Sequence, residues 1–289
     1  FFPGIPGCGK SSIVAGAEDE LRSALDERPE KRKLIVQMGD KTEGKYWRLV
    51  KRTRMNDSSC VYIADKNAPL STWGTVGDVC AATKAMPVPV LPDAAALSST
   101  RVDGVRMPDG SFNADFVHMY PFSLQYLAVC MARVIHRPEG SHPGNLDSAT
   151  SRACFVVVKF FCLYRKMTAD EFIATLSKSM GGAGSMMEPS PVEIPFFDPN
   201  SGEGHPLPAE LKDVLLEALR CQVRAESYRS LHSLVKLISV CFALPSMDSR
   251  EQKVIRHETR IPILTALIRE CGPVSRNTGT EFSLRQWIW

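Results

Sequence analysis

Gly4-Ile5-Pro6-Gly7-Cys8-Gly9-Lys10-Ser11 decides the fold, because it fits the phosphate-binding pattern GxxxxGK[ST] at every fixed position. Glycines let backbone N–H groups turn inward around phosphates, and a helix after the loop adds the positive end of its dipole. In this pattern Lys10 reaches the β and γ phosphates, and the Ser11 hydroxyl helps to hold Mg²⁺. The predicted nucleotide-binding residues are Gly4, Gly7, Cys8, Gly9, Lys10, Ser11 and Ser12. The alternative is a chance glycine-rich turn.

Strand-like and helix-like segments alternate on either side of this loop. Phe1-Phe2 has the character of the end of a buried strand, and residues 11–24 are compatible with a helix. Further strands are predicted at Leu34–Met38, Cys60–Ala64 and, edge-like, Pro87–Leu91, with a helix at Trp73–Lys84. This rhythm predicts an α/β fold, a P-loop NTPase-type kinase core whose parallel sheet is flanked by helices.

The remainder of the chain is predicted to be mainly helical. Residues 98–115 are rich in Ser, Gly, Asp and Asn and are expected to form a loop. Helices are predicted at Ser123–Arg137, twice within Arg152–Met180, and at Leu211–Leu219. The expected division is a kinase domain at 1–180, a Pro/Gly/Ser-rich linker at 181–208, and a mostly helical, incomplete C-terminal segment at 209–289. An alternative for this last segment is the truncated start of a phosphodiesterase domain.

Composition excludes several classes of protein. The chain has 289 residues, 44% hydrophobic and 23% charged, which is ordinary globular composition. Its nine cysteines include no CxxC pair, so zinc-ribbon and thioredoxin spacings are absent. We find no secretory signal and no apolar stretch that is long enough to span a bilayer, so no membrane partner is expected. We expect the cysteines to be free thiols. The expected location is nuclear or cytoplasmic, with the plastid as an alternative. Because the sequence starts at Phe1 inside a strand-like run, we expect it to be part of a longer chain.

Positive charge is concentrated in residues 31–54. This stretch holds two acidic residues, Asp40 and Glu43, against nine basic ones: Lys31, Arg32, Lys33, Lys41, Lys45, Arg48, Lys51, Arg52 and Arg54. A solvated basic face is one interpretation, and a phosphate-rich partner is the other.

Two aspartates follow predicted strands. The carboxyl ends of parallel strands face the nucleotide in such folds, so Asp40 is placed to accept a proton from an attacking hydroxyl, and its neighbours Lys41 and Lys45 favour an anionic acceptor. Asp65 ends an apolar strand, as in a Walker B element that orients the magnesium shell. Alternatively, Asp65 and Asn67 contact the acceptor strand, or each aspartate is a structural cap or turn residue.

Two arginines share one face of the predicted helix at Ser123–Arg137. Arg133 and Arg137 are four residues apart, opposite an apolar face that includes Leu127 and Met131. They are candidates for clamping the transferring phosphoryl group, and an ordinary solvated arginine face is the alternative. The triplet His257-Glu258-Thr259 is a single HxT motif, so no phosphodiesterase activity, which needs two, is expected.

Five strings in a fixed order carry a family resemblance. They are Phe1–Gly7 leading to Lys10-Ser11, Met38-Gly39-Asp40 followed by Gly44-Lys45-Tyr46-Trp47, Ala64-Asp65-Lys66-Asn67-Ala68-Pro69, Pro121-Phe122-Ser123-Leu124, and His142-Pro143-Gly144-Asn145-Leu146-Asp147. Over roughly residues 1–180, the chain resembles the polynucleotide kinase domain of plant-type tRNA ligases.

The resemblance implies the kinase step of a trifunctional RNA-repair enzyme, whose ligase would lie upstream of Phe1. Its kinase would phosphorylate the 5′-OH end of a tRNA half, with Mg²⁺ and with ATP or GTP as donor. Asp40 matches the general base, Asp65-x-Asn67 matches an Asp-x-Asn element, and Arg133 and Arg137 match lid arginines. Residues assigned to the acceptor RNA are Asp65, Asn67, Lys41 and Lys45, and those assigned to the metal are Ser11 and Asp65. The alternatives are another P-loop kinase or NTPase acting on a small substrate, and a nucleotide-switched interaction module.

Overall fold

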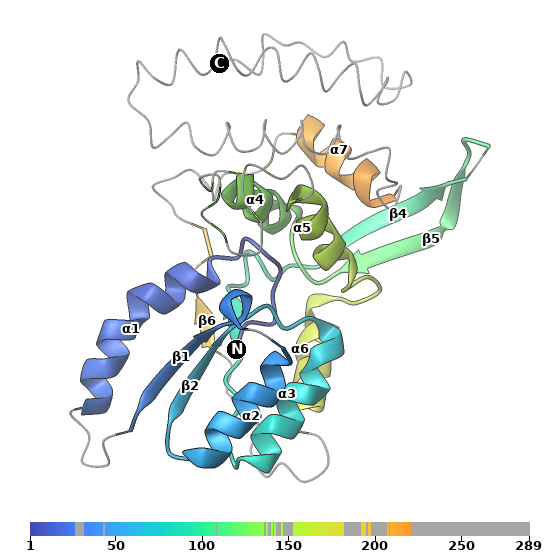
Figure 1. Cartoon of the computed structure of the whole chain (residues 1–289). Coiled ribbons are helices and arrows are strands. Elements are labelled where there is room, and N and C mark those ends of the chain that lie inside the picture. Colours follow the sequence, from blue (N-terminus) through green and yellow to red (C-terminus); the bar gives the residue numbers. More distant parts are fainter. Residues whose placement is uncertain are drawn as a thin grey trace, which may run out of the picture.

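The computed structural model describes residues 1–26, 32–42, 44–107, 109–135, 137, 140, 142, 146, 153–181, 192–194, 196–197, 207 and 209–220. These residues form a mixed α/β fold with a small parallel sheet (Figure 1). The helices are α1 (Lys10–Asp26), a 3₁₀ turn η1 (Gly39–Lys41), α2 (Tyr46–Asn56), α3 (Leu70–Ala82), α4 (Leu124–Ile135), α5 (Ala153–Cys162), α6 (Ala169–Met180) and α7 (Ala209–Arg220). The strands are β1 (Leu34–Met38), β2 (Val61–Asp65), β3 (Val90–Pro92), β4 (Thr100–Arg106), β5 (Phe112–Tyr120) and β6 (Val192–Ile194).

The N-terminal residues join two parallel strand pairs, β1–β2 and β3–β6. Phe2 forms a parallel bridge with Asn67, directly after β2. On the other side, the amide of Val90 donates to the carbonyl of Phe1 over 2.8 Å. The strands therefore follow the order β1, β2, Phe1–Phe2, β3, β6, and the glycine-rich loop leaves the middle of this layer.

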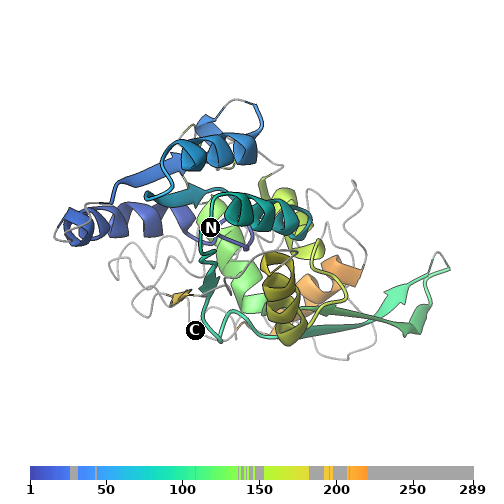
Figure 2. The ribbon, with the colours of Figure 1, turned by 90° about the horizontal axis from the view of Figure 1, so that it is seen from below.

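Helices cover both faces of the layer, as the sequence predicts. Figures 1 and 2 place α1 on one face of β1 and β2, and α2 on the other. Helix α6 packs beside α3, where the ring centroids of Trp73 and Phe172 lie 5.1 Å apart. In Figure 1, α4, α5 and α7 lie beyond the end of the sheet where β1 and β2 finish.

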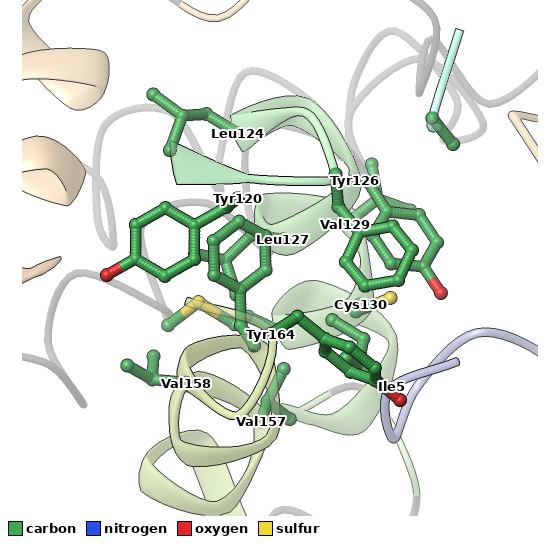
Figure 3. Packing of buried hydrophobic residues seen from close by; sticks show 14 of the residues in the cluster. Ile5, Tyr120, Leu124, Tyr126, Leu127, Val129, Cys130, Val157, Val158 and Tyr164 are labelled. Carbon is green, nitrogen blue, oxygen red and sulfur yellow. The ribbon is translucent and has the colours of Figure 1, made fainter. Parts of the chain in front are cut away.

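The largest hydrophobic core connects the glycine-rich loop to α4 and α5. Ile5 of the loop is fully buried in one cluster with Leu127 and Cys130 of α4 and Val157 of α5 (Figure 3). Tyr164, just after α5, belongs to the same cluster. Because the loop contributes a side chain to this core, its position is fixed by packing as well as by its own backbone.

The predicted loop at 98–115 is wrong, because β4 and β5 form an antiparallel hairpin that projects from the body (Figures 1 and 2). Val102 of β4 and Tyr120 of β5 are buried in the core, so the hairpin is anchored at its base. The loop was predicted from the Ser, Gly, Asp and Asn content of the segment alone. Its turn is built locally: the amide and hydroxyl of Ser111 donate to Asp109, and Gly110 has a φ of +85°.

Other elements differ from prediction in their surroundings. The third strand is not an edge, because β3 lies between Phe1 and β6. β6 itself comes from the predicted linker and lies beyond the expected boundary at residue 180. Helix α4 is buried almost all round rather than on one face, since both α5 and the glycine-rich loop pack against it.

Two further predictions, on membrane spans and on cysteines, can be compared with the described part of the chain. None of its helices has the length and apolar character needed to cross a bilayer. Cys8, Cys60, Cys80 and Cys162 carry free thiols, as predicted. The triplet at His257, and all of residues 221–289, lie outside the described residues.

Candidate nucleotide and acceptor site

Helix α4 shapes the glycine-rich loop. Gly7 and Gly9 have φ values of +89° and +87°, a region that favours glycine. A Cβ on Gly7 would collide with the backbone carbonyl of Cys130, so the loop lies directly against α4. A Cβ on Gly4 would lie 3.0 Å from the Tyr126 hydroxyl. Gly7 is thus required by close approach as well as by its place in the pattern, and Gly4 is closely packed.

The first turn of α1 meets the end of β2. The Ser11 hydroxyl donates a 2.8 Å hydrogen bond to Oδ2 of Asp65, the last residue of that strand. Asp65 is 6% exposed, and its Oδ1 atom is buried without a hydrogen-bond partner among the described residues. Oδ1 of Asn67 is likewise buried and unpaired among these residues. Unpaired buried oxygens are costly, and both of these have the chemistry to accept a hydrogen bond or to ligate a cation.

These oxygens fit Mg²⁺ in chemical type. Mg²⁺ takes hard oxygen ligands and is usually held by one or two carboxylates together with substrate phosphates and water. The described residues contain no group of three or more His, Cys, Asp or Glu side chains that could hold a metal alone. Ser11 and Asp65 supply a hydroxyl and a carboxylate oxygen, which are ligand types that Mg²⁺ accepts.

Asp40 lies at the same edge as Asp65. Met38, the last residue of β1, is in register with Asp65, and η1 carries Asp40 two residues later. The turn packs closely against the side chain of Lys66, because a Cβ on Gly39 would lie 2.7 Å from it. A hydrogen bond also closes the turn, since the Thr42 hydroxyl donates to the carbonyl of Met38 over 2.7 Å. The side chain of Asp40 is about half exposed, at 49%.

A histidine that the site prediction did not include approaches Asp40. Nε2 of His142 lies 3.4 Å from Oδ2 of Asp40, and the histidine side chain is largely buried at 17% exposure. The two residues are 102 positions apart, so no local spacing relates them. The family-like string that begins at His142 was the available signal.

Arg133 reaches the glycine-rich loop, but it is half-buried and does not lie on a solvated face. A Cβ on Gly9 would lie 3.6 Å from its Nη1 atom. Its guanidinium donates to the carbonyl of Phe196 over 2.7 Å and stands over the Phe196 ring, 4.4 Å from the centroid. Sequence reasoning missed Phe196, because it falls in a segment whose composition suggested a linker.

Arg137 has a different environment from Arg133. Its Nη1 atom donates a 3.0 Å hydrogen bond to the carbonyl of Leu146, and its side chain is half-buried. The predicted shared helix face is therefore wrong, because α4 ends at Ile135 and Arg137 follows it as a bend, while Arg133 lies within the helix. The other predicted residues lie as follows: Lys10 and Ser12 are in the first turn of α1, and Cys8 is half-buried in the loop. Lys41 follows Asp40 in η1, Lys45 directly precedes α2, and both are exposed.

The structure brings together the loop, Asp65, Asn67, Asp40 and Arg133 at one edge of the sheet. The edge thus combines a glycine-rich loop, a buried carboxylate, a guanidinium and the half-exposed carboxylate of Asp40. The catalytic and binding roles assigned to these residues remain predictions.

Comparison with known proteins finds a curated relative. tRNA ligase 1 of Arabidopsis thaliana is 32% identical over 220 residues, which is 76% of this chain. The chain contains a plant-type tRNA ligase-related domain. It spans 17% of the length of this relative. No protein-family profile matches the tRNA ligase-related chain, and no solved structure matches it.

Proposed function

We propose that this chain is the kinase module of an RNA-repair or tRNA-splicing ligase. It transfers the γ-phosphate of an NTP, ATP or GTP, to the 5′-OH end of an RNA such as a tRNA half. The observation that carries the proposal is the Ser11–Asp65 hydrogen bond, with Asp65 Oδ1 buried and unpaired beside a GxxxxGK[ST] loop. The relationship to a plant tRNA ligase supports RNA as the acceptor.

Each step is assigned to groups of this chain. Backbone amides of the Gly4–Ser11 loop bind the phosphates, and Lys10 neutralises charge that develops on them. Asp40 takes the proton of the RNA hydroxyl, whose oxygen then bonds to the γ-phosphorus as the bond to the NDP leaving group breaks. Arg133, beside Gly9, is placed to stabilise the phosphoryl oxygens.

Mg²⁺ completes the site in this proposal. Ser11 and Asp65 would hold it, and when bound it would offset negative charge on the β and γ phosphates. The acceptor enters over the exposed side of Asp40, where Lys41 and Lys45 attract an anionic chain. The exposure of this turn suits a polymer end better than a small enclosed substrate.

A transfer assay tests the proposal. Purified protein is given [γ-³²P]ATP or GTP, Mg²⁺ and a 5′-OH oligoribonucleotide, with a 5′-phosphorylated RNA of the same sequence as control. Label should appear only on the 5′-OH RNA, and Lys10→Ala should abolish it. NTP hydrolysis without transfer would indicate an NTPase, and neither reaction in either NTP would refute the kinase.

A further inference from the structure

Helix α2 carries basic side chains of two distinct kinds. Its buried face consists of Tyr46, Val50 and Arg54. The guanidinium of Arg54 is used within the fold, donating to the carbonyls of Cys60 and Ser58 over 2.6 and 2.9 Å. Arg54 therefore does not belong to a solvated basic run, although the sequence places it in one.

The opposite face of α2 is positive and exposed. We define the α2 basic face as Lys45, Arg48, Lys51 and Arg52, all of which are exposed. Lys45, Arg48 and Arg52 recur at spacings of three and four residues, so they form one row along the helix. None of these four side chains has an ion pair or hydrogen bond within the described parts of the chain. Four cations without internal partners attract an external polyanion rather than stabilise the fold.

This row begins at the candidate acceptor site and leads away from it. Lys45 precedes the first residue of α2 and follows the Asp40 turn by five positions. In Figure 1, α2 runs back along the sheet from the edge where β1 and β2 end. From Lys45 to Arg52 the helix rises about 10 Å, at 1.5 Å per residue. With nucleotides spaced about 3.4 Å apart along a stacked strand, this length corresponds to about three nucleotides.

We propose that the α2 basic face binds the phosphates of the RNA nucleotides that follow the 5′-terminal one. This proposal rests on the proposed function, because that function supplies the RNA end at Asp40. The face is a surface for the body of the substrate, separate from the residues that act on its terminal hydroxyl. It makes the enzyme favour long acceptors over short ones.

The test compares acceptors of two lengths. The double variant Arg48→Gln/Arg52→Gln is assayed with a 5′-OH dinucleotide and a 5′-OH RNA 12-mer. With the 12-mer, kcat/KM should fall roughly tenfold, and the slope of log kcat/KM against log salt should become shallower by about 0.7 for each phosphate that the variant no longer neutralises. With the dinucleotide, kcat/KM should stay as in wild type. The matched control, Lys159→Gln/Lys178→Gln, removes two exposed charges from α5 and α6 and should behave as wild type with both acceptors.

Two results would overturn the inference. Unchanged kcat/KM on the 12-mer would make the face an ordinary solvated one, and equal losses on both acceptors would place the arginines in the terminal site. A wild-type protein inactive on both acceptors would refute the proposed function instead. In that case, fluorescence anisotropy with the labelled 12-mer decides the inference, which requires weaker binding by the α2 variant than by wild type and control.

Discussion

The Ser11 hydroxyl and the Asp65 carboxylate lie 2.8 Å apart, although 54 residues separate them in the chain. Their contact joins the first turn of α1 to the end of β2, across the edge where the glycine-rich loop emerges. It leaves Asp65 Oδ1 buried and without a partner among the described residues, which motivates the first prediction.

Asp65→Asn should weaken the binding of Mg²⁺, because it removes the charged ligand while keeping the side chain's size. We expect the half-saturating Mg²⁺ concentration for phosphoryl transfer to rise by roughly tenfold or more. A Mg²⁺ titration of initial rates measures it. Asp78→Asn, at an exposed position of α3, serves as control and should leave the titration unchanged. An Asp65→Asn titration like that of wild type would remove Asp65 from the metal site.

The Asp40–His142 contact predicts that the histidine positions the general base. Asp40→Asn should keep nucleotide binding and slow turnover by roughly 10²–10⁴. His142→Ala should lower kcat by up to about 100-fold through misplacement of Asp40, with little change in KM for the NTP. His142→Gln, which keeps a donor at similar reach, should recover part of this loss.

A double-mutant cycle separates this role from a structural one. In the Asp40→Asn background, His142→Ala should cause little further loss, because the group that it positions is already disabled. Additive losses in the double variant would mean that His142 acts independently of Asp40.

The contacts of Arg133 predict that a positive charge at this position is not sufficient for full turnover. Its planar guanidinium contacts both the Phe196 carbonyl and ring, and a lysine cannot reproduce that geometry. Arg133→Lys should therefore lower turnover, and Phe196→Leu should do so more mildly by loosening the arginine. Steady-state kinetics with thermal denaturation of each variant measure this. Wild-type turnover in Arg133→Lys would leave the arginine with a packing role only.

The buried position of Arg54 predicts that its substitution lowers the stability of the fold, unlike substitution of the exposed Arg52. Its guanidinium is buried, so Arg54→Lys should leave the carbonyls of Cys60 and Ser58 poorly paired and lower the free energy of unfolding by roughly 1–3 kcal/mol. Arg52→Lys, two residues away and exposed, should change it by less than about 0.5 kcal/mol. Urea unfolding followed by circular dichroism distinguishes them, and equal midpoints would contradict the structural role of Arg54.

Local sequence was sufficient for the elements nearest the loop. The helix after Lys10, the strand at Leu34–Met38 and the strand that ends in Asp65 agree with prediction, since short apolar runs and glycine signals act over few residues. The same signals failed for β4 and β5: Phe112, Ala114, Phe116 and Tyr120 alternate along β5, but the Ser, Gly and Asp residues around the turn at Gly110 suggested a loop. They also failed for β6, whose pairing with β3 is a contact across about 100 residues.

By itself, the sequence determined the glycine-rich loop, the placement of Asp40 and Asp65 after parallel strands, and the family likeness, because each depends on residue type and spacing. Only the tertiary structure decided which of the described basic residues in 32–54 face solvent and that Arg54 does not. It also decided that His142 meets Asp40 and that Phe196 supports Arg133. Those relationships arise where segments that are distant in sequence pack against one edge of the sheet. The periodicity of residue types along the chain does not predict such contacts.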